Sequence, residues 1–580
     1  MIRNTLIGLL VVVIAALTYP GALLVSLSIV LTPPAATSPG PPGALPWLHV
    51  AHPSGARPYI ADEQGRMVLL HGTIPASLVD YWSGTNPTTD PFPGPFYPLE
   101  PAAYDGGRCP SNSSLYLYPP LCQDDIAEMA ELGFNSVRLP LTWSLLEPRR
   151  GEFNRTYLDR IAQVVDWARE RRMYVIIDMH QNAYSRFMDN TVNVALPGGK
   201  QIHLDSHSGA PAWATITDAF PSEDYFNKRE LNPAVFEAFN NFWYDRDGVQ
   251  DEYIDTLAFL AQRFKDDSTV AGFSVFNEPL NGWNLPPGFD DLLLFPFYRR
   301  VIDALTGMHD GLPCWSRFFM PAVCGYRDLG VHDTRHLVFI DTGLGREVTD
   351  FPTHLAMPVS SYPNVVLGVH AYTHIYTFDT FAGQPPDRAS YPWGGYEQGF
   401  DWADREAKAM NAALLVMEFG DSPEWDHEIV TNVLLQEEKH RVGFMFWTWK
   451  ENGDAGKWGI YSSRSDRAPC LRAGRERLLA RVYPRVTGDP NATFHYDSAD
   501  GRFTMRARGN AGDPTTVVYV PREAGGLITS DGAATVVVSE NEGDGSRLVF
   551  ATPTGGAFTI AVSAAPLRLS GCTSEVPASS

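Results

Sequence analysis

The chain has 580 residues, which is enough for one large domain and a smaller second domain. Hydrophobic residues make up 44% and aromatic residues 12%, so the chain can bury a large core and still supply rings for ligand contacts. Acidic residues outnumber basic residues 67 to 45, and the formal net charge is -22. Because phosphate backbones repel so acidic a protein and no Lys/Arg run offsets this, a nucleic-acid-binding function is excluded.

The N-terminus is predicted to direct the chain across a membrane. Leu6 to Leu31 is almost entirely apolar, with an interruption at Thr18-Tyr19-Pro20-Gly21. This run is longer than a usual signal-peptide core and close to the length of a spanning helix. We therefore expect residues 1–31 to be a signal peptide or an uncleaved signal anchor, with the remainder secreted or membrane-anchored on the non-cytoplasmic side. A Pro/Gly-rich linker is expected over residues 32–57.

The cysteines fit the same compartment, because an even number in a translocated chain suggests disulfides. The six are Cys109, Cys122, Cys314, Cys324, Cys470 and Cys572. Sequence alone leaves about fifteen connectivities open. We expect Cys109–Cys122 and Cys314–Cys324, each closing a short loop, and then Cys470–Cys572; free buried thiols are the alternative. Glycosylation sequons lie at Asn112, Asn154 and Asn491.

Residues 58–485 are predicted to form a (β/α)8 TIM barrel. Short apolar runs alternate with amphipathic stretches such as Asp124–Leu132, Tyr157–Arg171 and Glu252–Phe264. Such alternation indicates parallel strands joined by helices, and about eight units close a barrel. Two long loops, Asp80–Pro120 and Ala183–Asn232, are expected at its C-terminal face. The predicted strands are Val68–Gly72, Ser136–Pro140, Tyr174–Met179, Ala271–Phe276, Leu337–Ile340, Val365–His370, Leu414–Glu418 and Gly443–Trp447.

The last part of the chain, residues 486–571, has a different pattern. Short alternating runs are separated by Gly, Asp and Asn turns, with no helical stretch between them. This pattern predicts a C-terminal antiparallel β-sandwich. Its expected strands are Thr493–Tyr496, Phe503–Ala507, Thr515–Val520, Ala534–Ser539, Arg547–Ala551 and Ala557–Ser563.

Two carboxylates stand at the ends of predicted barrel strands, where side chains point into the active site. Glu278 follows the fourth strand and Glu418 ends the seventh, on opposite sides of the barrel mouth. Retaining glycoside hydrolysis needs two opposed carboxyl groups, one to attack the anomeric carbon and one to protonate the leaving oxygen. The prediction therefore includes a separation of roughly 5–5.5 Å between the two carboxyl groups.

The strand-end residues resemble those of glycoside hydrolase family 5. The most specific markers are Asn277-Glu278-Pro279 and Glu418-Phe419-Gly420. The resemblance implies that Glu278 is the acid/base and Glu418 the nucleophile, and we expect the charge of Glu418 to raise the pKa of Glu278. It also implies that Asn277 binds the sugar 2-hydroxyl and that Trp447 lies beneath the reactive sugar. The full set of implied substrate contacts is Arg138, His180, Asn182, Asn277, His370, Tyr372, Trp447 and Lys450.

Within that family the chain is similar to endoglycoceramidases, which release an intact glycan from ceramide. Two departures affect the expected sugar subsite. In this group an Asp commonly follows the motif Asp-Met-His-Gln, whereas this chain has Asn182 at that position. The segment from His71 to Pro75 also lacks the Asn and the downstream Lys of glucose-contacting members. An amide loses a charged acceptor but keeps a donor, so the choice between glucosyl- and galactosyl-linked ceramide stays open. The resemblance rests on Asp178–Gln181, Tyr184–Arg186, Gly209–Ala214, Pro296–Tyr298 and Trp447–Asn452.

Several other apolar residues allow both a structural and a ligand-binding interpretation. For Trp213, Trp283 and Trp393 we favour packing within loops over sugar contacts. Leu292–Phe295 is predicted to be helical core, with an apolar ceramide groove as the alternative.

The predicted activity is retaining endo-β-glycosidase hydrolysis of the glycan–ceramide bond of glycosphingolipids. One alternative is a β-glucosidase of the same family acting on glucosylceramide, steryl glucosides or a β-glucan. Another is a catalytically silent glycolipid-binding protein. No metal or organic cofactor is expected, because two carboxyl groups and water suffice. The expected partners are a β-glycoside substrate and a membrane surface, reached through the N-terminal anchor or an apolar groove.

Overall fold

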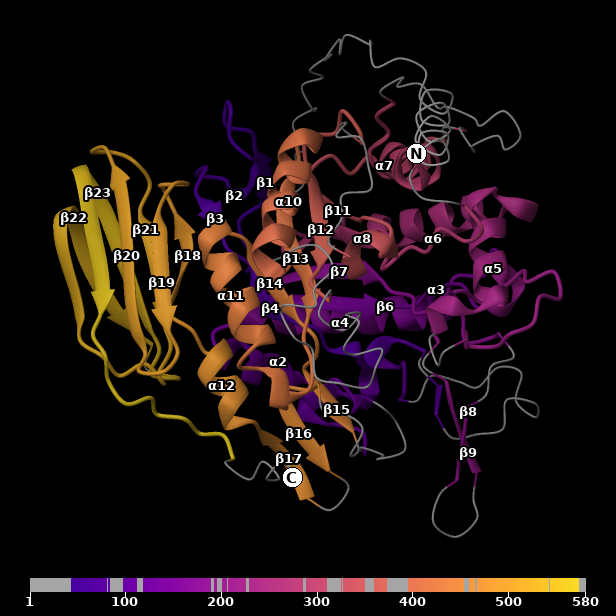
Figure 1. The fold of residues 1–580 in the computed structure, drawn as a ribbon, viewed down its shortest axis with the longest axis horizontal. Coiled ribbons are helices and arrows are strands. Elements are labelled where there is room, and N and C mark those ends of the chain that lie inside the picture. The colour runs from indigo at the N-terminus through magenta and orange to yellow at the C-terminus, as the bar shows by residue number, and fades with distance from the viewer. Residues whose placement is uncertain are drawn as a thin grey trace, which may run out of the picture.

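A closed barrel of eight parallel strands forms the centre of the computed structural model (Figure 1). The structure describes residues 43–80, 82–83, 97–111, 118–188, 192–195, 201–205, 207–225, 229–284, 288–309, 325, 327–349, 359–372, 395–452, 458–464, 467–541 and 543–572. In barrel order the strands are β4 (His71–Thr73), β6 (Ser136–Leu141), β7 (Tyr174–Met179), β10 (Val270–Ser274), β11 (Leu337–Asp341), β12 (Val365–His370), β13 (Ala413–Phe419) and β14 (Gly443–Phe446). The predicted TIM barrel is confirmed.

Helices surround the barrel and follow the predicted alternation. The helix α4 shows why the sequence places them: Asn154 precedes its first residue, and the Asn154 side chain accepts a hydrogen bond from the backbone N–H of Tyr157 at 3.1 Å. The helices are α2 (Gln123–Glu131), α3 (Trp143–Leu146), α4 (Arg155–Glu170), α5 (Pro233–Trp243), α6 (Val249–Phe264), α7 (Phe295–Thr306), α8 (Leu344–Thr349), α10 (Gly395–Met410), α11 (Ile429–His440) and α12 (Ala473–Leu479).

A nine-stranded antiparallel sheet packs beside the barrel (Figure 1). The first half of its longest strand, β23, pairs with β21 and the second half with β20, so both halves contribute to one core that includes Phe503, Val549 and Ile560. The six predicted C-terminal strands correspond to five observed strands, because the last two predicted strands form one continuous strand, β23. These five are β19 (Thr493–Asp497), β20 (Arg502–Gly509), β21 (Thr516–Val520), β22 (Ile528–Glu540) and β23 (Arg547–Val562), and the sheet also contains β18 (Tyr483–Thr487), which was not predicted.

The N-terminal part of this sheet differs from the prediction. The strands β1 (Leu48–Ala51), β2 (Tyr59–Asp62) and β3 (Met67–Val68) extend it, although residues 48–51 fall within the predicted linker. Because β3 pairs with β18, the first predicted barrel strand is divided, and only His71–Thr73 belongs to the barrel. Pairing with strands more than 400 residues away leaves no local pattern in the sequence.

Two small sheets and two disulfides complete the described chain. The disulfides Cys109–Cys122 and Cys470–Cys572 are formed as predicted, whereas Cys314, Cys324 and the sequon at Asn112 lie outside the described residues. Residues 1–31 also lie outside them, and within the described part no helix combines the length and apolarity needed to cross a bilayer. The small sheets contain β5 (Trp82–Ser83), β8 (Val192–Ala195) and β9 (Gln201–Asp205), and β15 (Lys450–Asn452), β16 (Tyr461–Arg464) and β17 (Arg467–Leu471).

Removing the longer-range disulfide should cost more stability than removing the local one. Cys470 and Cys572 are 102 residues apart, whereas Cys109 and Cys122 are 13 apart. A cross-link that closes a longer loop removes more entropy from the unfolded chain, so the double serine variant of Cys470 and Cys572 should lose about 4 kcal/mol and that of the local pair about 3 kcal/mol. Denaturant unfolding followed by tryptophan fluorescence measures both losses. An equal or larger loss for the local pair would contradict this ordering.

Candidate active site

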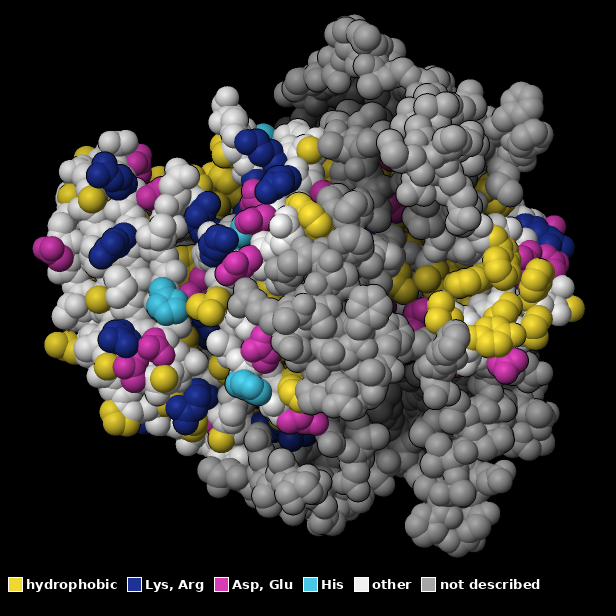
Figure 2. All heavy atoms as spheres, in the orientation of Figure 1, with side chains coloured by type: hydrophobic (Ala, Val, Ile, Leu, Met, Phe, Trp, Pro, Cys, Tyr) yellow, Lys and Arg dark blue, Asp and Glu magenta, His cyan; other side chains and the backbone are white. Residues whose placement is uncertain are grey.

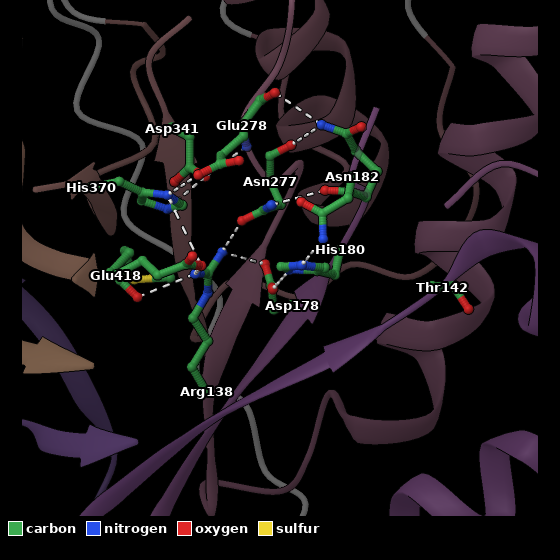
Figure 3. Close-up of polar contacts among 12 residues, drawn as sticks. Arg138, Thr142, Asp178, His180, Asn182, Asn277, Glu278, Asp341, His370 and Glu418 are labelled. Carbon is green, nitrogen blue, oxygen red and sulfur yellow. Dashed lines mark hydrogen bonds and ion pairs between the residues drawn. The ribbon is translucent and has the colours of Figure 1, made fainter. Parts of the chain in front are cut away.

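The predicted strand-end residues meet at the C-terminal mouth of the barrel (Figure 3). Together with Asp341, they come from seven of the eight barrel strands or the segments that follow these strands, although hundreds of residues separate the first from the last. Most of these side chains are buried. The structure brings together Arg138, Asp178, His180, Asn182, Asn277, Glu278, Asp341, His370, Tyr372, Glu418 and Trp447.

The two predicted catalytic carboxylates face the same space. One carboxylate oxygen of Glu278, one of Glu418 and a ring nitrogen of His370 all lie within 4.8 Å of one another. The backbone of Glu278 has φ 44°, in the left-handed region that residues with a side chain rarely adopt. Such backbone strain is found mainly where a side chain must be aimed at a functional site. The side chain of Glu278 is thus held toward Glu418 at an energetic cost to the local backbone.

Both oxygens of Glu418 accept hydrogen bonds from the barrel. Arg138 donates from Nη1 to Oε2 at 2.7 Å, and the Tyr372 hydroxyl donates to Oε1 at 2.9 Å. These two donors fix the orientation of the carboxylate. Burial raises the pKa of Glu418, against the opposing positive charges of His370 and Arg138, and the neighbouring charge of Glu278 adds to the rise.

Arg138 is fully buried and connects several strands. Besides Glu418, it donates to Asp178 on β7 at 3.0 Å and to Asn277, which follows β10. Burial favours neutral Asp178, but the charge of Arg138 and a hydrogen bond with His180 outweigh it and lower the pKa of Asp178 to about 2. The guanidinium is therefore surrounded by ionised or polar acceptors, as a buried charge requires.

Glu278 forms a second polar chain with His370 and Asp341. The Nδ1 atom of His370 lies 2.9 Å from Oε1 of Glu278, and its Nε2 atom lies 3.4 Å from Oδ2 of Asp341. Burial pushes the pKa of Glu278 upward, but the hydrogen bond and positive charge of His370 outweigh it, so the pKa lies below the ordinary glutamate value. The expected elevation of this pKa by Glu418 is therefore wrong for this arrangement, because His370 contacts Glu278 directly and its charge and hydrogen bond lower the pKa.

His180 is held by protein groups on both sides of its ring. Its Nδ1 atom lies 3.0 Å from Asp178, and its Nε2 atom lies 3.3 Å from Nδ2 of Asn182. Arg229 donates to Oδ1 of Asn182 at 3.0 Å, which turns the amide nitrogen toward His180. Nε2 of His180 is thus the acceptor, and Nδ1 carries the proton. These contacts fix the orientation of the His180 ring beside the barrel mouth.

Trp447 provides an aromatic surface next to this network. Its ring stacks on that of His180, with centroids 5.6 Å apart and planes 9° apart, and Tyr118 meets it edge-on at 5.9 Å. The position is suited to the predicted contact beneath a pyranose ring, because aromatic faces bind the apolar faces of sugars.

Lys450 is not placed with the other predicted substrate contacts. Its ammonium binds Asp125 at 2.6 Å and Glu128 at 3.1 Å, both on α2, and the indole N–H of Trp449 also donates to Asp125. The acidic first turns of α2 therefore attract this side chain to the barrel exterior. Lys450 stabilises the segment that follows Trp447 instead of binding in the mouth.

The structure decides between the structural and ligand interpretations of several apolar residues. Trp213 packs edge-on against Trp143 at 5.1 Å and donates to the backbone of Glu147, as loop packing predicts. Residues Leu292–Phe295 are buried, so they form core and leave no groove. Trp283 differs from its prediction, because 46% of it is exposed. Trp393 lies outside the described residues.

Sequence reasoning missed three groups that shape the site. Asp341 ends β11 and contacts His370, and the strand-end rule that found the other residues applies to it equally. Gln181 donates to the backbone carbonyls of Asn277 and Glu278 at 2.7 and 2.9 Å. Arg229 comes from a short 3-10 helix in the long loop after β7, where no local signal marks it.

The spacing of Glu278, His370 and Glu418 would also suit ligands of a metal ion. However, Nη1 of Arg138 lies 2.7 Å from Glu418, and a guanidinium repels a cation at that distance. The arrangement is better matched to a neutral substrate on which positive charge develops between two carboxylates.

Comparison with known proteins agrees with this geometry. The family model described as Cellulase (glycosyl hydrolase family 5) matches residues 109–453. Endoglycoceramidase I of Rhodococcus hoagii is 25% identical over 447 residues, which cover 73% of this chain and 79% of the relative. An endoglycoceramidase of Hydra vulgaris is 30% identical over 202 residues, covering 32% of this chain and 38% of the relative.

Solved structures show the same fold. An endogalactoceramidase structure aligns with a TM-score of 0.64 at 24% identity, covering 90% of this chain and 100% of the other. A complex of endo-glycoceramidase II from Rhodococcus sp. with ganglioside GM3 aligns with a TM-score of 0.63 at 22% identity, covering 87% of this chain and 99% of the other. With its barrel, its carboxylate pair and a family match over residues 109–453, the chain belongs to glycosyl hydrolase family 5 and is a glycoside hydrolase.

Proposed function

We propose that the enzyme is a retaining endo-β-glycosidase that hydrolyses the bond between the glycan and the ceramide of glycosphingolipids. The observation that carries this proposal is the carboxylate pair at the barrel mouth, whose facing oxygens lie within 4.8 Å. The substrate class is supported by the similarity to proteins named endoglycoceramidase, one of which aligns with 73% of this chain. The solved ganglioside GM3 complex of a structural neighbour supports the same class.

In the first step, an oxygen of Glu418 attacks the anomeric carbon while Glu278 protonates the ceramide oxygen. The bond from the anomeric carbon to that oxygen breaks, ceramide leaves as an alcohol, and an ester joins the sugar to Glu418. Arg138 and Tyr372 orient the attacking carboxylate from the opposite side. Tight hydrogen bonding of this kind keeps the nucleophile within reach of the sugar ring.

In the second step, the carboxylate of Glu278 removes a proton from water, which attacks the anomeric carbon and releases Glu418. Two inversions give net retention of the β configuration. Inverting enzymes need carboxyl groups roughly 6.5–9.5 Å apart, because water must fit between one carboxylate and the sugar. The short separation between Glu278 and Glu418 supports retention over inversion.

His370 regulates when Glu278 can serve as the acid. A positively charged His370 holds Glu278 as a carboxylate, whereas a neutral ring removes that charge and leaves burial to favour the protonated acid. On the other side of the ring, Oδ2 of Asp341 lies 3.4 Å from Nε2 of His370. His370 is therefore the neighbour whose charge and hydrogen bond oppose the effect of burial on the pKa of Glu278.

A β-glucosidase acting on steryl glucosides or glucosylceramide is the second candidate. Ergosteryl-beta-glucosidase of Saccharomyces cerevisiae is 31% identical over 117 residues, although these cover only 19% of this chain and 13% of the relative. A sterylglucosidase structure from Cryptococcus neoformans aligns with a TM-score of 0.56 at 15% identity. A silent glycolipid-binding protein is disfavoured, because it would not need a carboxylate on a strained backbone, Glu278, facing a buried one, Glu418.

We also propose that the enzyme acts outside the cytoplasm, as a secreted or membrane-anchored glycoprotein. The apolar N-terminal run, the sequons at Asn154 and Asn491 and the two disulfides support this location. Asn491 is exposed in a turn, which leaves its amide accessible to a glycan. The domain limits proposed from the sequence are a targeting segment to residue 31, a catalytic domain to residue 485 and a sheet domain to residue 571.

Product analysis tests the substrate class. Incubation with a mixed panel of glycosphingolipids and steryl glucosides should release intact oligosaccharides and free ceramide, identified by mass spectrometry. Stepwise loss of monosaccharides, or cleavage of steryl glucosides alone, would favour the second candidate. Comparing the hydrolysis rates of glucosyl- and galactosyl-linked lipids in the panel determines the sugar preference, which Asn182 in the sequence leaves open.

Replacing the nucleophile should stop turnover without unfolding the protein. Glu418→Gln removes the attacking charge, and we expect kcat to fall by about 10⁴-fold or more. The fold should persist because Arg138 keeps its ion pair with Asp178. The matched control is Glu437→Gln, since Glu437 is also a buried glutamate, whose pKa burial raises well above the usual value, and it lies on α11 away from the mouth. Native-rate hydrolysis by Glu418→Gln would show that another residue is the nucleophile.

The pH profile should respond to His370 in a defined direction. The acid form of Glu278 is needed for leaving-group protonation, so kcat/KM falls as pH rises through its pKa. Since His370 lowers that pKa, His370→Asn should move the alkaline limb to higher pH, measured with an alkyl β-glycoside whose leaving oxygen must be protonated. Tyr372→Phe removes a donor to Glu418 without changing the charge near Glu278, so its alkaline limb should stay in place. A limb that stays or moves to lower pH in His370→Asn would contradict this role.

A further inference from the structure

An exposed apolar patch lies over α5 and the loops beside it. Four of the eight strongly exposed large hydrophobic side chains in the described residues are found here: Phe220 at 42%, Tyr225 at 46%, Leu231 at 41% and Trp283 at 46%. Figure 2 shows hydrophobic side chains gathered at the end of the molecule where Figure 1 places α5. We define these four residues and Phe236, which contacts Trp283, as the apolar patch.

The patch is built from residues that hold one another in place. The ring of Trp283 lies 5.5 Å from that of Phe220 and 5.2 Å from that of Phe236. The indole N–H of Trp283 donates to Glu237 at 2.7 Å, so its one polar atom is satisfied by the protein. The rings therefore offer apolar faces to the exterior in a fixed arrangement.

Described residues of the loop before α5 are also held by hydrogen bonds. Asn232 caps α5 by accepting from the N–H of Ala234 at 2.9 Å, and its amide donates to Ser222 at 3.2 Å and Asp224 at 2.9 Å. These bonds tie the segment around Tyr225 to the start of the helix. Exposure of a large apolar patch on such a rigid frame indicates a contact surface, because packing alone does not require it.

The patch lies on the same face of the barrel as the active site. Trp283 is in the loop that follows β10 and Glu278, and Phe220 and Leu231 are in the loop that follows β7. Both loops leave the C-terminal ends of strands, which is the side of the barrel mouth. Arg229, two residues before Leu231, reaches into the mouth and bonds Asn182 at 3.0 Å.

The chemistry of the proposed reaction specifies which side of the mouth faces lipid. Glu278 protonates the leaving oxygen, so the ceramide portion of a substrate lies on the Glu278 side. The loop that carries Trp283 begins at that residue. Because ceramide is anchored in a lipid layer, the surface next to Glu278 must approach that layer before the bond can enter the site.

We infer that the apolar patch docks the enzyme on an electrically neutral lipid surface and aligns the Glu278 side of the mouth with membrane-embedded substrate. This inference rests on the proposed function. Exposed Trp, Tyr and Phe side chains favour the boundary between headgroups and acyl chains. The formal charge of -22 repels anionic headgroups, so the docking surface is zwitterionic lipid, not an acidic one.

A fluorescent label tests docking without any need for turnover. In the full chain, Trp283→Cys labelled with an environment-sensitive dye should shift to shorter emission wavelength when phosphatidylcholine vesicles are added. The matched control is Leu435→Cys on α11, which is 40% exposed and outside the patch, and its label should not shift. No shift at position 283 overturns the inference. An emission already shifted to shorter wavelength without lipid also overturns it. If that shift depends on protein concentration, a second copy of the chain covers the patch; if it does not, the chain's own apolar N-terminal segment covers it.

An activity measurement separates docking from catalysis. For the double variant Phe220→Ser and Trp283→Ser, kcat/KM on glycolipid in phosphatidylcholine vesicles should fall about tenfold or more, because two large apolar contacts with lipid are lost. Hydrolysis of a water-soluble aryl β-glycoside should stay within about twofold, because the patch does not touch the reacting atoms. Leu435→Ser should resemble the wild type on both substrates.

The outcomes distinguish this inference from the proposed function. Equal losses on both substrates by the double variant would overturn the docking role, since the patch would then act through the site or the fold. A wild-type enzyme that cleaves the aryl glycoside but no glycolipid would contradict the proposed function, while the emission shift at position 283 would still decide whether the patch binds lipid.

Discussion

The buried guanidinium of Arg138 is the interaction on which the catalytic mouth depends. A charge without solvent access is tolerated only when opposite charges and acceptors surround it, and Arg138 obtains them from Asp178, Asn277 and Glu418. These partners belong to different strands of the barrel, so the charge can be satisfied only when the barrel is closed in the correct register. The same contacts that stabilise the buried charge orient Glu418, the proposed nucleophile.

This dependence explains why the two carboxylates of the site differ in their surroundings. Glu418 receives fixed donors from Arg138 and Tyr372, whereas Glu278 meets the titratable ring of His370. In the proposed reaction, the nucleophile needs one orientation throughout, but the acid/base must lose and regain a proton in each cycle. A guanidinium beside Glu418 and an imidazole beside Glu278 match these two proposed roles.

Much of this arrangement could be predicted because barrel strands leave strong local patterns. Short apolar runs between amphipathic helices placed all eight strands, and the rule that strand ends point into the mouth located Glu278 and Glu418. Asp341 also lies at a strand end, so the same rule predicts it as a site residue. Lys450 shows the limit of a motif: its neighbours match the family, yet acidic residues on α2 attract its side chain away from the mouth.

Other features could not be predicted, because they depend on three or more groups from distant parts of the chain. The strands β1 to β3 join a sheet whose remaining strands come more than 400 residues later, and no local periodicity encodes that pairing. A neighbouring carboxylate alone predicts a raised pKa for Glu278, but the direction of the shift depends on His370, which only the folded barrel places against Glu278. A prediction made from two residues of the sequence does not include the effect of a third residue that the fold brings next to them.

The mouth also has an asymmetry that follows from its chemistry. On the Glu418 side, the sugar would meet a buried network of charged and polar groups centred on Arg138, which suits hydroxyl groups that need fixed partners. On the Glu278 side, the loops lead outward to Trp283 and the rest of the apolar patch. An amphiphilic substrate has the same asymmetry, with polar hydroxyls on one side of the scissile bond and hydrocarbon on the other. A soluble polysaccharide has hydroxyls on both sides and would make no use of the aromatic surface, so the distribution of polarity across the mouth itself favours a glycolipid.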